Sequence, residues 1–183
     1  RGLGGSEMCL SDSPDEALRK DAARQQLRQP TVLARHARRM LEDPKATRLA
    51  TEFFGQWFGF YRFDQYRGVD TSRFPEWSET IQSAMYQEAI ALCTHIVRGN
   101  RPPAELLFAD YTFLNRSLAS HYGVPFPEPA NADPQQASTT LLRRVNDVQR
   151  SHRGGLLRLG AVLTVTSAPL RTSPVRRGDW VLR

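Results

Sequence analysis

The sequence has few features that would indicate a metal centre, an attached cofactor or a membrane anchor. Its two cysteines, Cys9 and Cys93, lie far apart and form no CxxC or CxxCH motif, which excludes a Cys-rich zinc site and a covalently held c-type haem within the segment. No apolar run approaches the roughly 20 residues of a membrane-spanning helix. We therefore predict no metal site, no cofactor in this segment and no membrane span. Whether the two cysteines pair stays open, because both lie in apolar surroundings.

The length and composition are those of a globular protein. The chain has 183 residues, of which 40% are hydrophobic and 9% aromatic. A chain of this length can bury a sizeable core without help from metals or disulfides. Both ends of the sequence look like cuts through a longer polypeptide, so we expect the segment to be part of a multidomain protein.

Helix start signals and apolar stripes predict an all-α fold. Ser13-Pro14 and Asp43-Pro44 each place an N-cap residue before a proline in the first helical turn. Short connections indicate that the first three helices are antiparallel neighbours. The predicted long helices cover residues 14–27, 30–42, 43–57 and 75–97. Shorter helices are predicted at 104–109, 111–121 and 156–162 and from 174 onward, and residues 138–146 could form an extended segment.

A Pro-rich stretch divides the chain. Four prolines and no periodic apolar pattern lie between Val124 and Ala137, which is typical of a linker or long surface loop. We therefore predict a helical bundle over 1–123, a Pro-rich linker over 124–137, and a basic C-terminal segment over 138–183. The last segment would start a second, truncated domain and pack back on the bundle.

The positive charge is concentrated after this linker. Residues 143–183 hold nine arginines, no lysine and two aspartates, a net charge of +7, whereas the whole chain carries +6. Arginine suits bidentate contact with carboxylates, phosphates or sulfates; the alternative is that these arginines pair with acids elsewhere in the parent protein. The aromatic residues lie mainly in the helical half, so we expect no nucleic-acid stacking surface and no nucleic-acid partner.

Three stretches of the chain carry a family resemblance. They are ARRMLEDPKATRLATEFFGQWFGF, ADYTFLNRSLASHYGVP and RGGLLRLGAVLTVTSAPLRTSPVRRGDWVL. In this order they resemble signatures of two families of domains of unknown function, family 1592 over most of the chain and family 1588 over its C-terminal part. Such domains occur together in large exported proteins of planctomycetes and some other bacteria, frequently beside cytochrome c modules.

The resemblance implies a setting for the segment and supplies no chemistry. It implies an all-helical module in the periplasm or at the cell surface, whose partners are the other domains of the parent protein, including cytochrome c modules. Any haem would belong to those neighbouring modules. The families carry no established catalytic residues.

Two polar residues fall on the apolar face of the predicted helix 75–97. Glu88 and His95 are seven residues apart, two turns along one face. They could act in catalysis as a proton relay or bind a divalent metal, but known helical metal motifs space their ligands three or four residues apart. The structural interpretation is a buried acid with an arginine partner and a histidine hydrogen-bonded in the core. We predict that Arg171, Arg176 or Arg177 reaches Glu88.

The C-terminal segment TVTSAPLRTSPVRRG is a candidate anion-binding site. Hydroxyls, free backbone amides at a helix start and flanking guanidinium groups are what a sulfate, phosphate or uronate needs; the alternative is an ordinary capped helix entry. The predicted anion-binding residues are Arg171, Thr172, Ser173, Arg176 and Arg177.

Two functions from different classes follow from these observations. The first is an accessory or scaffold module that mediates contact between domains or with anionic polysaccharide. The second is part of a redox or hydrolytic enzyme acting on polyanionic polysaccharide, with Glu88 and His95 as acid/base groups or metal ligands. The sequence does not decide whether the segment is an enzyme.

Overall fold

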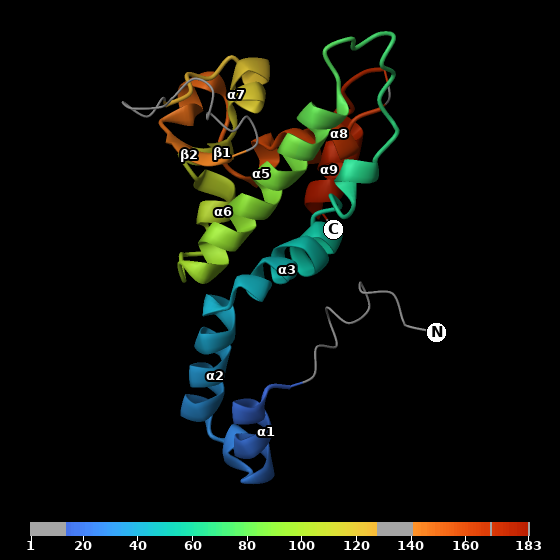
Figure 1. Ribbon diagram of the computed structural model, residues 1–183. Helices are drawn as coiled ribbons and strands as arrows, with labels where there is room; N and C mark the ends of the chain where they lie inside the picture. The colour runs from blue at the N-terminus through green and yellow to red at the C-terminus, as the bar shows by residue number, and fades with distance from the viewer. Residues whose placement is uncertain (1–13, 128–140, 169, 183) are drawn as a thin grey trace. The chain divides into compact units, whose positions relative to one another are not determined.

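The computed structural model describes residues 14–127, 141–168 and 170–182 (Figure 1). The chain divides into two compact units, one of residues 1–48 and one of residues 49–183. The predicted linker over 124–137 lies mostly outside the described residues, as does Cys9. The predicted domain boundaries stay predictions.

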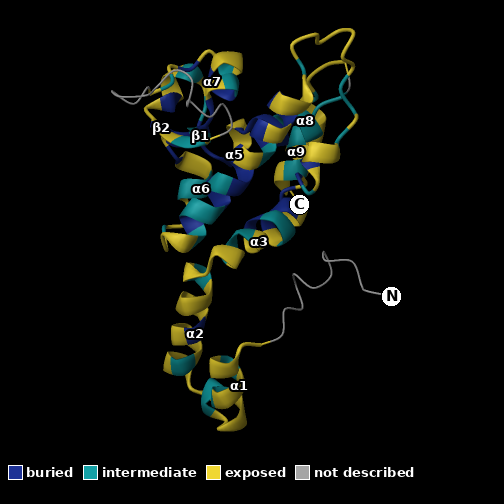
Figure 2. Cartoon of the chain, viewed as in Figure 1, coloured by how far each residue is buried: buried dark blue, intermediate teal, exposed yellow. Residues whose placement is uncertain are grey.

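The first unit is a pair of helices joined by a 3₁₀ turn. Its elements are α1 (Glu16–Ala23), η2 (Gln26–Arg28), α2 (Pro30–Glu42) and η3 (Pro44–Ala46). Polar contacts connect α1 to α2, since Asp21 accepts hydrogen bonds from Arg35 at 2.7 Å and His36 at 2.8 Å. His36 is the buried residue of α2, and Figure 2 shows that most of this unit is exposed. A polar network therefore supplies much of the contact between α1 and α2.

The second unit is mostly helical, which confirms the predicted fold class. The short helix α3 (Thr47–Leu49) leads into it from the first unit. Its elements are η4 (Ala50–Phe54), α4 (Gly55–Trp57), η5 (Phe63–Gln65), α5 (Glu79–Arg98), α6 (Glu105–Phe108), β1 (Tyr111–Leu114), α7 (Arg116–Tyr122), β2 (Arg143–Asn146), η6 (Val148–Ser151), η7 (Leu156–Arg158), α8 (Gly160–Val165) and α9 (Pro174–Leu182).

Helix α5 is the central element of the second unit. It begins after Ser78, whose hydroxyl accepts a hydrogen bond from the Ile81 amide, and ends at Gly99. The helix contacts η4, η5, β1, α7 and α8, and Leu92 and Cys93 are completely buried. Figure 2 shows buried residues along α5. Polar groups on its covered faces must therefore find partners inside the protein.

A two-stranded sheet replaces part of a predicted helix. We predicted one helix over 111–121, but Tyr111–Leu114 forms strand β1, and α7 begins only after Asn115, whose side chain accepts from the Leu118 amide. Strand β1 pairs antiparallel with β2, which lies in the segment predicted to be extended. Aromatic and β-branched residues suit a strand buried on both faces. This pairing joins residues 143–146 to the helical body.

The C-terminal segment packs on the same body, as expected. Helix α8 contacts α5, and Trp180 in α9 donates a hydrogen bond from Nε1 to the Phe58 carbonyl at 3.0 Å. The Trp180 ring also lies 6.3 Å from the Phe58 ring. These contacts join α9 to the aromatic part of the second unit.

Candidate functional site

A cavity of about 520 Å³ lies within the second unit. This volume is typical of pockets that bind small ligands. Aromatic rings form part of its wall, and basic and hydroxyl side chains of the C-terminal segment form another part. The aromatic lining residues are Tyr66, Phe74, Trp77 and Tyr122; the polar ones include Glu76, His121, Arg153, Thr164, Ser167, Arg171, Thr172 and Arg177.

The charge of the cavity wall favours an anion. Among the described residues, three arginines, Arg153, Arg171 and Arg177, line it against one acid, Glu76. Arg177 donates from Nη2 to the Ser167 hydroxyl at 3.3 Å. Its buried Nε has no hydrogen-bond partner among the described residues. A buried guanidinium donor without a partner is costly unless a ligand satisfies it.

The five predicted anion-binding residues fall into two groups. Arg171, Thr172 and Arg177 line the cavity. Ser173 instead accepts a hydrogen bond from the Arg176 amide at 3.3 Å, as a helix cap does, and Arg176 donates from Nη1 to the Ser167 carbonyl at 2.8 Å. The segment therefore contributes three of the five predicted residues to the cavity lining and also forms the capped helix entry that was the alternative.

Glu88 lies in the core and contacts Tyr122, a residue of the cavity lining. It is 1% exposed, and its two carboxyl oxygens accept hydrogen bonds from Thr112 Oγ1 at 2.5 Å and Tyr122 Oη at 2.8 Å. Burial raises the pKa of Glu88 to about 7, against the lowering effect of these hydroxyls and of the Arg153 charge. The carboxyl group can therefore change charge near neutral pH.

The arginine that acts on Glu88 differs from the predicted ones. Arg153 stacks on the Tyr122 ring, with its guanidinium carbon 3.6 Å from the ring centroid, and its charge lowers the pKa of Glu88. The prediction that Arg171, Arg176 or Arg177 pairs with Glu88 was wrong, because hydroxyls from β1 and α7 already occupy both carboxyl oxygens. The prediction of a buried acid on this face is confirmed.

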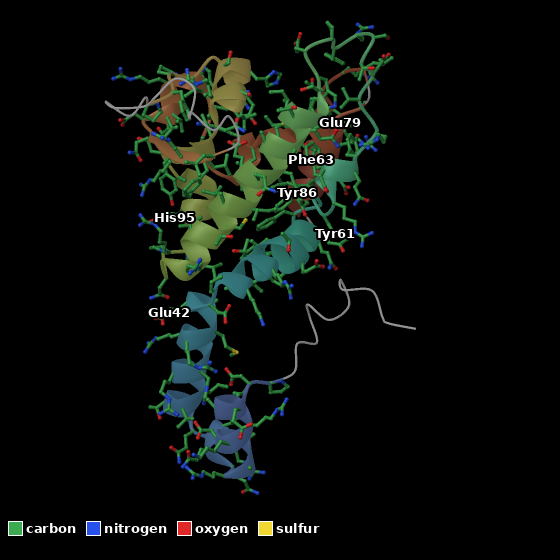
Figure 3. All side chains as sticks on the ribbon, in the orientation of Figure 1. Glu42, Tyr61, Phe63, Glu79, Tyr86 and His95 are labelled. Carbon is green, nitrogen blue, oxygen red and sulfur yellow. The ribbon has the colours of Figure 1, made fainter. Side chains whose placement is uncertain are left out.

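His95 occupies a separate environment near the C-terminal end of α5 (Figure 3). Seven residues of helix separate it from Glu88 by roughly 10 Å along the axis. Its ring packs on those of Tyr111 and Phe113, with centroids 5.4 and 5.3 Å away, and its buried Nε2 has no partner among the described residues. Burial, followed by the charges of Arg144 and Arg101, lowers the pKa of His95. The structure thus does not bring Glu88 and His95 together.

Sequence reasoning missed the residues that connect Glu88 to the cavity. Tyr122 and Arg153 both line the cavity and both act on Glu88. They lie 34 and 65 positions from it in the sequence, so no helical spacing could reveal the contact. Only the Arg-rich composition of the C-terminal segment indicated that an arginine from that segment acts on Glu88.

The described residues hold no group of three or more histidine, cysteine, aspartate or glutamate side chains placed to bind a metal. None of the helices within the described ranges combines the length and apolar character required to cross a bilayer. Cys93 is a free buried thiol whose pKa burial raises to about 12, so it is an unreactive core residue.

Fold and site together define a mostly α-helical domain with an arginine- and aromatic-lined cavity. Residues 6–124 match the profile of the family described as protein of unknown function DUF1592. The chain belongs to this family. The match ends at Val124, where the Pro-rich stretch begins. No curated protein and no solved structure matches the chain.

Proposed function

We propose that this chain is a non-catalytic accessory module that binds an acidic saccharide in the cavity of the second unit. The observation that carries the proposal is a cavity lined both by aromatic rings and by three arginines, one of which has an Nε without a partner among the described residues. A guanidinium group can bind a carboxylate or sulfate through two parallel hydrogen bonds. An aromatic face supplies a broad apolar surface for the rest of the ligand.

The setting of this module in its parent protein is part of the proposal. We propose that the C-terminal part belongs to family 1588, and that the parent is an exported protein with cytochrome c modules. The module would hold an anionic polymer beside those domains, in the periplasm or at the cell surface. The resemblance of RGGLLRLGAVLTVTSAPLRTSPVRRGDWVL to that family supports this setting.

Titration with short saccharides tests the binding function directly. Oligouronates and sulfated oligosaccharides form the two acidic arms, and a neutral oligosaccharide of equal length is the control ligand. We expect the acidic ligands to bind at least about tenfold more tightly, because the lining carries three cations and one acid. The stronger arm identifies carboxylate or sulfate as the recognised group. Equal affinity for neutral and acidic ligands would refute an anion site.

Matched arginine variants locate the site. Arg171→Gln and Arg177→Gln remove lining cations, whereas Arg150→Gln removes the same charge from an exposed residue of η6 that does not line the cavity. We expect about tenfold weaker binding for each of the first two variants and little change for the third. Similar losses in all three would indicate binding to general positive charge.

A second candidate function is a hydrolytic or redox enzyme for polyanionic polysaccharide. Its support is Glu88, whose pKa of about 7 suits a general acid or base. Glu88 does not line the cavity, however, and its oxygens face Thr112 and Tyr122. Turnover of an acidic polysaccharide that is lost in Glu88→Gln, or stoichiometric metal in the purified protein, would favour this function over the accessory module.

A further inference from the structure

We propose that the cavity takes up its anionic ligand together with a proton, and that Glu88 is the group that receives it. The inference rests on the proposed function, because it concerns how binding at that same site is regulated. Its structural basis is a series of contacts: Glu88 in the core contacts Tyr122, and Tyr122 contacts Arg153 in the cavity lining.

The first step is the connection between Glu88 and the cavity. Tyr122 Oη donates to Glu88 at 2.8 Å, while Tyr122 itself lines the cavity. Arg153 lies on the Tyr122 ring at 3.6 Å and also lines the cavity. Its guanidinium donates from Nη1 to the Arg158 carbonyl at 3.3 Å. The charge of Glu88 is therefore one aromatic side chain away from the ligand.

The second step is the effect of that charge on a bound anion. A carboxylate in the core repels an anion in the cavity, and this repulsion is stronger in the protein interior than in water. The Tyr122 side chain, which contacts Glu88 and lines the cavity, lies between the two charges. The carboxylate also offsets part of the positive potential of Arg153, the cation that acts on it. Protonation of Glu88 removes the repulsion and leaves Arg153 free to attract the ligand. Anion binding is then stronger when Glu88 is neutral.

The third step is reciprocity between ligand and proton. If protonation strengthens binding by some factor, bound ligand raises the proton affinity of Glu88 by the same factor. One proton passes from solvent to the Glu88 carboxylate, and no covalent bond of the ligand changes. The ordinary carboxyl would be ionised throughout the neutral range, but burial brings the pKa of Glu88 to about 7. The coupling therefore operates near physiological pH.

Other titratable groups near the site must be separated from Glu88. Tyr122 and Arg153 are the titratable side chains that contact or act on it from neighbouring elements, and burial raises the pKa of Tyr122 well above its usual value. His121 and Glu76 line the cavity. The pKa of His121 is lowered by burial, so it becomes charged only in more acidic solution. Glu88→Gln and His121→Gln distinguish the two contributions.

The experiment is calorimetric titration of the whole chain with a sulfated disaccharide, whose charge is constant over the range used. We expect affinity to fall about tenfold from pH 5.5 to pH 9. At pH 7.5, binding should take up roughly half a proton per ligand, measured as the difference in heat between buffers of unlike ionisation enthalpy. Glu88→Gln should remove both effects and bind at high pH as the wild type does at low pH. His121→Gln should retain the proton uptake.

A measurement on the wild-type chain makes the test independent of whether the variant folds. Carbon-13 NMR of the Glu88 carboxyl should show its pKa rising by about one unit on addition of the disaccharide. An unchanged titration of Glu88, or equal pH dependence in Glu88→Gln, overturns this inference and leaves the binding function standing. Absence of binding at every pH overturns both.

Discussion

Glu88 and His95 lie on the same helix, yet their side chains have different surroundings. Glu88 is enclosed by two hydroxyl donors and lies near an arginine. His95 packs against two aromatic rings and leaves Nε2 without a partner among the described residues. The comparison shows that a polar residue on a buried helix face does not by itself indicate a site. What distinguishes Glu88 is the chain of contacts that leads from it to a cavity.

The two residues also respond oppositely to pH. The pKa of Glu88 is raised in the folded state, so its protonation favours folding, and that stability is lost as the pH rises toward and through 7. The pKa of His95 is lowered, so its contribution is lost as the pH falls below its ordinary value of 6.5. The contrast between them can be tested by removing each in turn.

The largest effect is expected from Glu88→Ala. The variant leaves the Thr112 and Tyr122 hydroxyls without their acceptor and opens a hole in the core. We expect a loss of about 4 kcal/mol in the free energy of unfolding at pH 5.5, measured by urea denaturation. Glu79→Ala is the control, because Glu79 is an exposed residue in the first turn of the same helix (Figure 3), and should cost under about 1 kcal/mol. Similar losses of stability in both variants would contradict the prediction that buried Glu88 stabilises the core.

The pH dependence of stability is the next largest effect. A folded pKa of about 7 against an ordinary 4.5 corresponds to about 3 kcal/mol of stability present below pH 4.5 and lost above pH 7. Glu88→Gln keeps the shape of the protonated acid and should flatten the unfolding profile between pH 5 and 8. A profile with the same slope in wild type and variant would assign the dependence to other groups.

A smaller effect is expected from Gly160→Ala. A Cβ at Gly160 would lie 2.2 Å from Tyr122 Oη and 2.8 Å from Met85 Sδ, so the Tyr122 hydroxyl that donates to Glu88 must shift. We expect a loss of about 2 kcal/mol and a change in the pKa of Glu88, measured by NMR. Gly178→Ala is the control, because its Cβ would meet nothing within 4 Å; it should be neutral or slightly stabilising. If Gly160→Ala were as stable as the wild type, Tyr122 would not be held in place beside Gly160.

The sequence predicted the helical frame better than the site. Helix α5 was expected over 75–97 and occupies Glu79–Arg98, because Ser78 is its N-cap, whereas the Pro75 signal placed the start of the helix four residues earlier. Strand β1 was missed because its partner β2 lies some 30 residues away, and such distant pairing overrides local helix signals. The burial of Glu88 followed from helical periodicity. Its contacts to Tyr122 and Arg153 could not follow from it, because they depend on how distant segments pack.

The smallest effect is expected from His95→Phe, which changes the second residue of the comparison. A phenyl ring can pack on Tyr111 and Phe113 as the imidazole does, and it removes the buried nitrogen that has no partner among the described residues. We expect the free energy of unfolding to stay within about 1 kcal/mol of wild type at pH 7.5, since the phenyl ring replaces the ring packing of the imidazole with apolar contacts of the same kind. At pH 5 the variant should be the more stable protein, because the wild type must either protonate a half-buried imidazole or keep it neutral below its ordinary pKa. A loss above about 2 kcal/mol at pH 7.5 would mean that the imidazole makes a polar interaction essential to the fold, and the contrast with Glu88 would no longer hold.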